Sequence, residues 1–156
     1  MSNENTCYRQ FEDAAAKCLA GETLRTALDF SAYMQENGIT PFGPHGAVCY
    51  RDNVLCYMLL DEGTDMPAPW TIWPEGDFNE EPTDALLDND MKEAAWAHVN
   101  FCTDCGCGNP GGDKVVFGRL FEKVCNSVFV FYMPDAAALE CVKRLFAIKM
   151  RAYDAV

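Results

Sequence analysis

AVCYRDNVLCYMLL, residues 47–60, is the stretch of sequence that decides the fold. Two runs rich in valine, tyrosine and cysteine, 47–51 and 54–60, flank the dipeptide Asp52-Asn53. Such runs favour strands, and a two-residue polar turn between them is typical of a β-hairpin. Because a hairpin joins antiparallel neighbours, this stretch predicts a sheet that is mainly antiparallel.

Helical periodicity lies on both sides of the hairpin. Apolar residues recur at helical spacing over residues 8–19, 24–34, 91–102 and 138–152. Asp90 and Glu93 have capping-box spacing at the start of the third helix, and Pro134-Asp135 begins the last one. Further short strands are predicted at 70–73, 114–117 and 127–133, while residues 121–125 could extend a strand or form a turn.

This order of elements, with its hairpins, predicts an α+β fold. We expect a mainly antiparallel sheet of three to five strands with helices packed on it, the C-terminal helix among them. No linker or change of composition divides the chain, so residues 1–156 are expected to form a single domain.

The net charge of the chain is −12, and it is unevenly distributed. Residues 1–113 hold 5 basic and 20 acidic side chains, whereas residues 114–156 hold 7 basic and 4 acidic ones. A field this negative repels phosphate backbones, so we expect neither nucleic acid nor an anionic membrane as a partner. A small molecule or another protein is the expected partner.

The apolar segments of the sequence show neither a membrane span nor a signal peptide, and the cellular location is predicted from this. The longest unbroken apolar run, residues 54–60, is far shorter than the roughly 20 residues that span a bilayer. The N-terminal residues show no basic segment followed by an apolar one, as a signal peptide would. We therefore expect a cytoplasmic protein.

Cysteine is the chemically most informative residue type, with nine copies in the chain. The run FCTDCGCGNPGGDK, residues 101–114, contains a C-x-x-C-G knuckle at Cys102 and Cys105. In such a turn the glycine lets both thiolates face one point. Tetrahedral zinc needs four ligands of this kind, commonly cysteine or histidine. The knuckle therefore predicts a zinc site.

Three further residues are candidates for the remaining zinc ligands. Cys107 and Cys125 are the nearest additional thiols. His98 precedes Cys102 by four residues, so a helix over this segment would place both on one face. We predict that Cys102, Cys105 and Cys125 are ligands, and that the fourth is either Cys107 or His98.

Two other interpretations of the cysteines stay open. Cysteine is among the most buried residue types, and these thiols could simply pack on a turn and a helix end. Alternatively, Cys105 and Cys107 could close a strained, redox-active disulfide. The odd number of cysteines excludes a complete disulfide framework, and no thioredoxin-like βαβ unit precedes the knuckle.

Catalytic motifs are poorly represented in the sequence. Cys49 is close in sequence to His45, but closeness in sequence does not establish a nucleophile with its base. The glycines of residues 106–112 and the following Lys114 miss the spacing of a phosphate-binding loop.

Aromatic side chains are numerous enough to line a ligand pocket. Strand alternation would place Trp70 and Trp73 on opposite faces of one strand. The candidates for the pocket are Tyr57, Trp70, Trp73 and Trp96. Packing in the core is the alternative for each of them. A pocket that opened on the acidic segment after Trp73 would favour a cationic or neutral ligand.

From Trp96 onward the runs WAHVNFC, VVFGRLFEKVCNSVF and PDAAALECVKRL, with the tripeptide Cys-Gly-Cys between them, resemble a group of small uncharacterised bacterial proteins. The resemblance covers about the last third of the chain. It implies that the cysteine loop and the start of the last helix belong to a recurring module. It implies no activity and no catalytic residue.

Two functions of different kinds are therefore compatible with the sequence. One is a binding or regulatory domain in which a zinc ion stabilises the cysteine loop. The other is a thiol- or metal-dependent enzyme. We favour the binding domain because the sequence offers few convincing acid–base residues.

Overall fold

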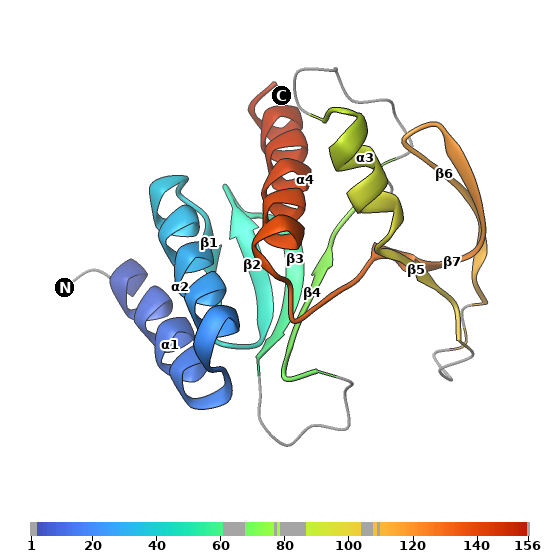
Figure 1. Cartoon of the computed structure of the whole chain (residues 1–156). Coiled ribbons are helices and arrows are strands. Elements are labelled where there is room, and N and C mark those ends of the chain that lie inside the picture. Colours follow the sequence, from blue (N-terminus) through green and yellow to red (C-terminus); the bar gives the residue numbers. More distant parts are fainter. Residues whose placement is uncertain are drawn as a thin grey trace.

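The computed structural model describes residues 3–60, 68–76, 78, 87–103, 108 and 110–155, and gives only the backbone of residues 3 and 4. Within these residues the chain forms helices and two antiparallel sheets (Figure 1). This architecture confirms the α+β fold predicted from the sequence. The predicted strands are divided between a five-stranded and a three-stranded sheet.

The larger sheet contains the predicted hairpin and has the strand order β1-β2-β3-β4-β8, with every pair of neighbours antiparallel. Its strands are β1 Thr40–Pro41, β2 Gly46–Tyr50, β3 Asn53–Leu60, β4 Trp70–Pro74 and β8 Phe131–Tyr132. Met58 lies opposite Ile72, and Ile72 opposite Phe131. All three side chains are buried, so this row belongs to the core face of the sheet.

The turn of the β2–β3 hairpin lies one residue earlier than predicted. Tyr50 pairs with Asn53, so the turn residues are Arg51 and Asp52 instead of Asp52 and Asn53. Both have positive φ, 48° and 66°, as a type I′ turn requires. The pairing register also shifts after Val48. The register of the ladder therefore outweighs the preference of asparagine for a turn position.

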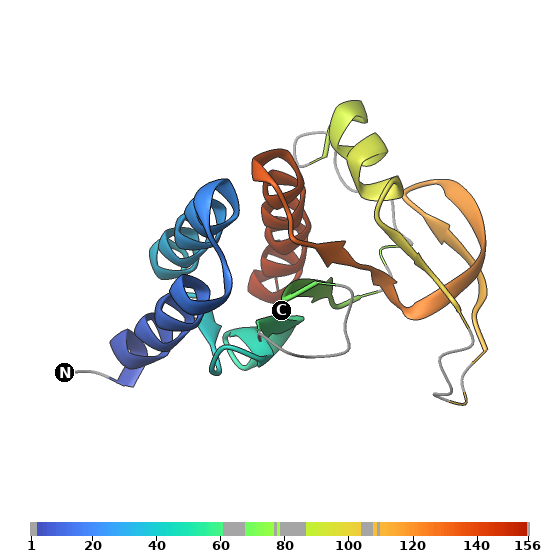
Figure 2. The same ribbon diagram turned by 60° about the horizontal axis from the view of Figure 1, so that its bottom comes forward.

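Three helices lie on one side of the larger sheet, as Figures 1 and 2 both show. They are α1 Asn3–Cys18, α2 Gly21–Glu36 and α4 Ala136–Asp154. The helix α4 packs against β3 and β4, which confirms the prediction for the C-terminal helix. Asp135 caps it by accepting a hydrogen bond from the Ala138 N–H at 2.8 Å. Of the helices described, none is sufficiently long and apolar to cross a membrane.

The smaller sheet has the strand order β5-β7-β6. Its strands are β5 Val99–Phe101, β6 Gly112–Val116 and β7 Arg119–Phe129, and the helix α3 Asn89–Trp96 precedes them. The long strand β7 includes residues 121–125, whose structure the sequence left open. Only Val130 lies between the end of β7 and the start of β8, so the chain passes directly from the smaller sheet to the larger one.

The helix α3 begins at a different cap from the predicted one. The carboxylate of Asp88 accepts a hydrogen bond from the Met91 N–H at 2.9 Å. Asp90 therefore lies within the first turn, where its charge still stabilises the helix N-terminus. Aspartate at the N-cap satisfies one of the free N–H groups, and here this replaces the predicted capping box.

The prediction of a helix over residues 91–102 was wrong in its second half. The helix ends at Trp96, and the chain then continues as β5, where Val99 lies opposite Phe129. The apolar periodicity persists to Cys102, but pairing with β7 satisfies the backbone of residues 99–101 in a sheet. Tertiary pairing thus overrides the helical pattern.

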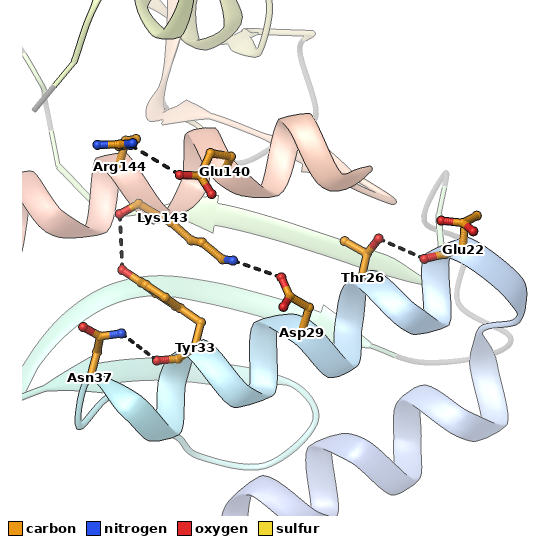
Figure 3. A network of polar contacts seen from close by, with 8 residues as sticks. All are labelled: Glu22, Thr26, Asp29, Tyr33, Asn37, Glu140, Lys143 and Arg144. Carbon is orange, nitrogen blue, oxygen red and sulfur yellow. Dashed lines mark hydrogen bonds and ion pairs between the residues drawn. The ribbon is translucent and has the colours of Figure 1, made fainter.

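Polar contacts join α2 to α4 above the sheet (Figure 3). The Lys143 ammonium lies 3.0 Å from a carboxylate oxygen of Asp29 and 5.2 Å from the centre of the Tyr33 ring. The Tyr33 hydroxyl donates a hydrogen bond to the Lys143 carbonyl at 3.3 Å. Burial, with a smaller contribution from the Glu140 carboxylate, raises the pKa of Tyr33 to about 12. The neutral phenol is therefore part of the α2–α4 contact.

This pKa predicts that stability falls at alkaline pH. The unfolded chain ionises a tyrosine near pH 10, whereas the folded protein keeps Tyr33 neutral until about pH 12. The stabilising effect is complete below pH 10 and is lost as the pH rises through 12. The free energy of unfolding should therefore fall as the pH is raised above 10. Allowing for the partial exposure of Tyr33, we expect this fall to be about 1–2 kcal/mol smaller in Tyr33→Phe than in the wild type.

The measurement is urea unfolding at about pH 9 and about pH 11.5, compared between the wild type and Tyr33→Phe. Tyr57→Phe is the matched control, because Tyr57 is 48% exposed and lies on the opposite side of the sheet from the helices. An equal fall of stability in the wild type and in Tyr33→Phe would contradict the assignment.

Candidate functional site

The segment of residues 102–112, which carries the cysteine knuckle, is held to β7 at both ends. The Cys102 N–H donates a hydrogen bond to the Lys123 carbonyl at 2.7 Å, and Phe101 pairs with Val124. Gly112, at the other end of the segment, pairs with the same Val124 from the opposite side. The strand β7 thus lies between the two ends of the cysteine segment.

Gly111 packs closely at the base of this segment. A Cβ at Gly111 would lie 2.5 Å from the Cβ of Cys102 and 2.8 Å from the carbonyl oxygen of Lys123. Real Cβ atoms do not approach other heavy atoms this closely, so a larger residue would separate the two ends. The two ends of the segment can lie this close together because residue 111 is a glycine and has no side chain.

The predicted zinc ligands Cys102 and Cys125 come from adjoining parts of the smaller sheet. Cys125 is on β7, two residues after Lys123, and both thiols are half-buried. Cys105 and Cys107 lie outside the described residues. Within the described part of the chain, no three histidine, cysteine, aspartate or glutamate side chains gather closely enough to hold a metal.

His98 is placed by the core and not by a shared helix face with Cys102. Its ring stacks on Phe131, with the centroids 4.3 Å apart and the planes at 28°. Burial lowers the pKa of His98, against a smaller raising effect of the Asp135 carboxylate. Because α3 ends at Trp96, the strand β5 separates His98 from Cys102. This position agrees with a neutral packing histidine.

Three cysteines of the larger sheet and of α4 have less reactive thiols. Cys56 and Cys141 are buried, and burial raises the pKa of both, to about 12 for Cys141. Burial and the Asp52 carboxylate raise the pKa of Cys49 as well. A raised pKa lowers the fraction of thiolate, which is the nucleophilic form. Cys56 and Cys141 act as small apolar residues of the core.

The four aromatic residues predicted to line a pocket occupy three separate places. Trp70 is fully buried between the sheet and the helices, with its ring 6.2 Å from that of Phe30. Tyr57 and Trp73 are cross-strand neighbours on the opposite face of the larger sheet. The Trp96 indole N–H donates to the Val116 carbonyl of the smaller sheet at 2.8 Å. These contacts do not bring the four together around one cavity.

Two features of the structure were not found from the sequence. Arg119 on β7 lies over the ring of Trp96, which belongs to α3. A groove of about 520 Å³ also runs between α1 and the β1–β2 connection, with Cys18 and His45 among its lining residues. Both features join segments that are distant in sequence. Alternation along a strand that included both residues is the one sequence signal that could have placed Arg119 and Phe121 on the same face.

Comparison with known proteins gives no relative for this chain: no protein-family model, no curated protein and no solved structure matches it.

The tight base of the cysteine segment generates a prediction. Gly111→Ala should lower the free energy of unfolding by about 1–3 kcal/mol, because the new methyl group collides with Cys102 and Lys123. Gly112→Ala is the matched control, because a Cβ at Gly112 meets nothing within 4 Å. Neither glycine has a positive φ that would itself disfavour alanine. Denaturant unfolding of both variants tests the prediction, and equal stabilities would contradict it.

Proposed function

We propose that this chain is a binding or regulatory domain in which the cysteine segment holds one structural zinc ion. The ligands in this proposal are Cys102, Cys105, Cys107 and Cys125. The observation that carries it is the hydrogen bond between the Cys102 N–H and the Lys123 carbonyl at 2.7 Å. This contact ties the start of the knuckle to the strand that bears Cys125.

The surroundings of the cysteine segment support a structural role for the metal. The segment is anchored at both ends on β7, and it carries two thiols between its ends at Cys105 and Cys107. Four thiolates close a tetrahedral zinc ion and leave no position for a substrate. Such a site contributes its binding free energy to folding, which compensates for the small size of a three-stranded sheet.

Metal analysis tests the proposal directly. Protein prepared under reducing conditions should contain about one equivalent of zinc, and a chelator should lower its melting temperature. Zinc should be retained less well as the pH falls, because protonation of the thiolates competes with the metal. Less than about half an equivalent of zinc, together with a melting temperature that a chelator leaves unchanged, would reject the site.

Single variants distinguish the two possible fourth ligands. Cys107→Ser should lose zinc, whereas His98→Gln should retain it, because His98 stacks on Phe131. Cys49→Ser is the matched control for removing a half-buried thiol elsewhere. Retention of zinc by the double variant Cys102→Ser/Cys105→Ser would reject these ligands while leaving a metal site elsewhere. If Cys107→Ser retained zinc and His98→Gln lost it, the fourth ligand would be His98 in place of Cys107.

A thiol-dependent enzyme is the alternative, and one observation favours it. The 520 Å³ groove beside α1 is lined by Cys18, His45 and Asp13. A thiol, an imidazole and a carboxylate are the residue types of cysteine-based acyl transfer. If the groove is catalytic, alkylation of Cys18 by iodoacetamide should slow about tenfold or more in His45→Ala. An unchanged rate would leave the binding domain as the sole proposal.

A further inference from the structure

A continuous row of side chains lies on the smaller sheet, next to the cysteine segment. The Arg119 guanidinium is 5.3 Å from the centre of the Trp96 ring and 5.1 Å from that of Phe121. The Phe121 ring is in turn 6.3 Å from that of Phe101. We call these four residues the Arg119 row. It begins on α3, crosses β7 and ends on β5, directly before Cys102.

Strand alternation gathers two cations on one face of the β6–β7 hairpin. Val116 lies opposite Arg119, and Lys114 opposite Phe121, so these four side chains share the face of the Arg119 row. The pair Val115 and Leu120 points to the other face, and the register shifts between Gly112 and Lys114. Among the regularly paired residues 114–116 and 119–121, the face that carries the row therefore has two cations and no carboxylate.

Arg119 is held by rings and has no carboxylate partner among the described residues. Arg25, Arg51 and Arg144 each form an ion pair, with Glu22, Asp154 and Glu140. Arg119 is exposed, and within the described structure its guanidinium lies over the rings of Trp96 and Phe121. A guanidinium that is held by rings and not by a carboxylate keeps its N–H donors for another acceptor, and two of these donors fit an oxyanion in two-point geometry.

Phe101 adds an apolar surface at the end of the row. Its side chain is 49% exposed although it lies in a strand of a small sheet. The Phe121 ring connects Phe101 to the cation, because it lies 6.3 Å from the Phe101 ring and 5.1 Å from the Arg119 guanidinium. The rings offer stacking for a planar group, and the guanidinium offers a charge for an anion. The aromatic surface and the guanidinium, which would recognise a ring and an anion, thus belong to the same row.

We propose that the Arg119 row binds a small aromatic anion, with a planar ring against Phe101 and Phe121 and an oxyanion on Arg119. The net charge of −12 selects against polyanions, since repulsion by the overall field grows with the charge of the ligand. A ligand with one or two negative charges is favoured instead. Nucleoside monophosphates and aryl carboxylates share this chemistry.

This inference deepens the proposed binding function but does not depend on the metal. The row consists of residues that the described structure positions by direct contacts, and none of them is a proposed zinc ligand. Zinc content and anion binding are therefore measured separately on the same protein. Anion binding without zinc would remove the metal proposal alone, and zinc without anion binding would remove this inference alone.

Calorimetric titration of the full chain tests the row with four probes. Adenosine 5′-monophosphate and 4-hydroxyphenylacetate carry both a ring and an anion, adenosine carries only the ring, and inorganic phosphate only the anion. We expect at least one of the first two to bind about tenfold or more tightly than either partial probe. Which of the two binds more tightly identifies the source of the ligand.

Variants assign the binding to the row. Arg119→Gln should weaken it about tenfold or more, Phe101→Ala should weaken it about threefold to tenfold, and Arg119→Lys should not fully restore it because lysine lacks the two-point geometry. Arg25→Gln is the matched control, an exposed arginine of α2 that should leave binding unchanged. Circular dichroism and the melting temperature confirm that each variant is folded. Absence of binding below about 5 mM for both ring-bearing anions, or equal binding by Arg119→Gln, would overturn the proposal.

Discussion

The packing of Trp70 against the helices is the contact on which the rest of the structure depends. Its ring lies 6.5 Å from that of Phe11 on α1 and 6.2 Å from that of Phe30 on α2. Phe30 is also 6.0 Å from Phe146 of α4, so one aromatic cluster joins three helices to β4. The indole N–H of Trp70 has no hydrogen-bond partner among the described residues, which costs about 1–3 kcal/mol. Burial of so large an apolar surface outweighs that cost.

A second aromatic cluster attaches the smaller sheet to the larger one. The Phe129 ring of β7 lies 5.2 Å from Phe78 and 6.5 Å from Phe131 of β8, and His98 stacks on Phe131. In the β5–β7 pair, Val99 lies opposite Phe129, whereas Phe101 lies opposite Val124. The cluster therefore holds one end of the smaller sheet, and the cysteine segment extends from the other. At that end the fully buried Val124 of β7, which pairs with both Phe101 and Gly112, connects the base of the cysteine segment to the main core.

The sequence predicted those parts of the fold in which local pattern and tertiary contact agree. The hairpin, the first two helices and the capped C-terminal helix have the expected apolar spacing, and all of them are present. The failures occur where pairing overrides pattern: the segment after Trp96 joined β7, and the hairpin turn moved by one residue. The candidate site divides similarly. The knuckle can be recognised as a sequence motif. The contact of Cys102 with Lys123 depends on the three-residue strand β5, which no local sequence pattern predicted.

Charge segregation within one acidic chain is the remaining physical feature of this fold. The 5 basic residues among residues 1–113 include Arg25 and Arg51, each of which is paired with a carboxylate. In the regularly paired part of the β6–β7 hairpin, Lys114 and Arg119 instead lie on one face, and residues 114–116 and 119–121 include no carboxylate. A period of two along two paired strands is sufficient to place both cations on the same face. Because aromatic rings occupy the places beside Arg119 that carboxylates occupy elsewhere, the charge of its guanidinium stays uncompensated within the described structure. An overall negative protein can thus present a local anion-binding surface, and the composition of the chain alone could not show it.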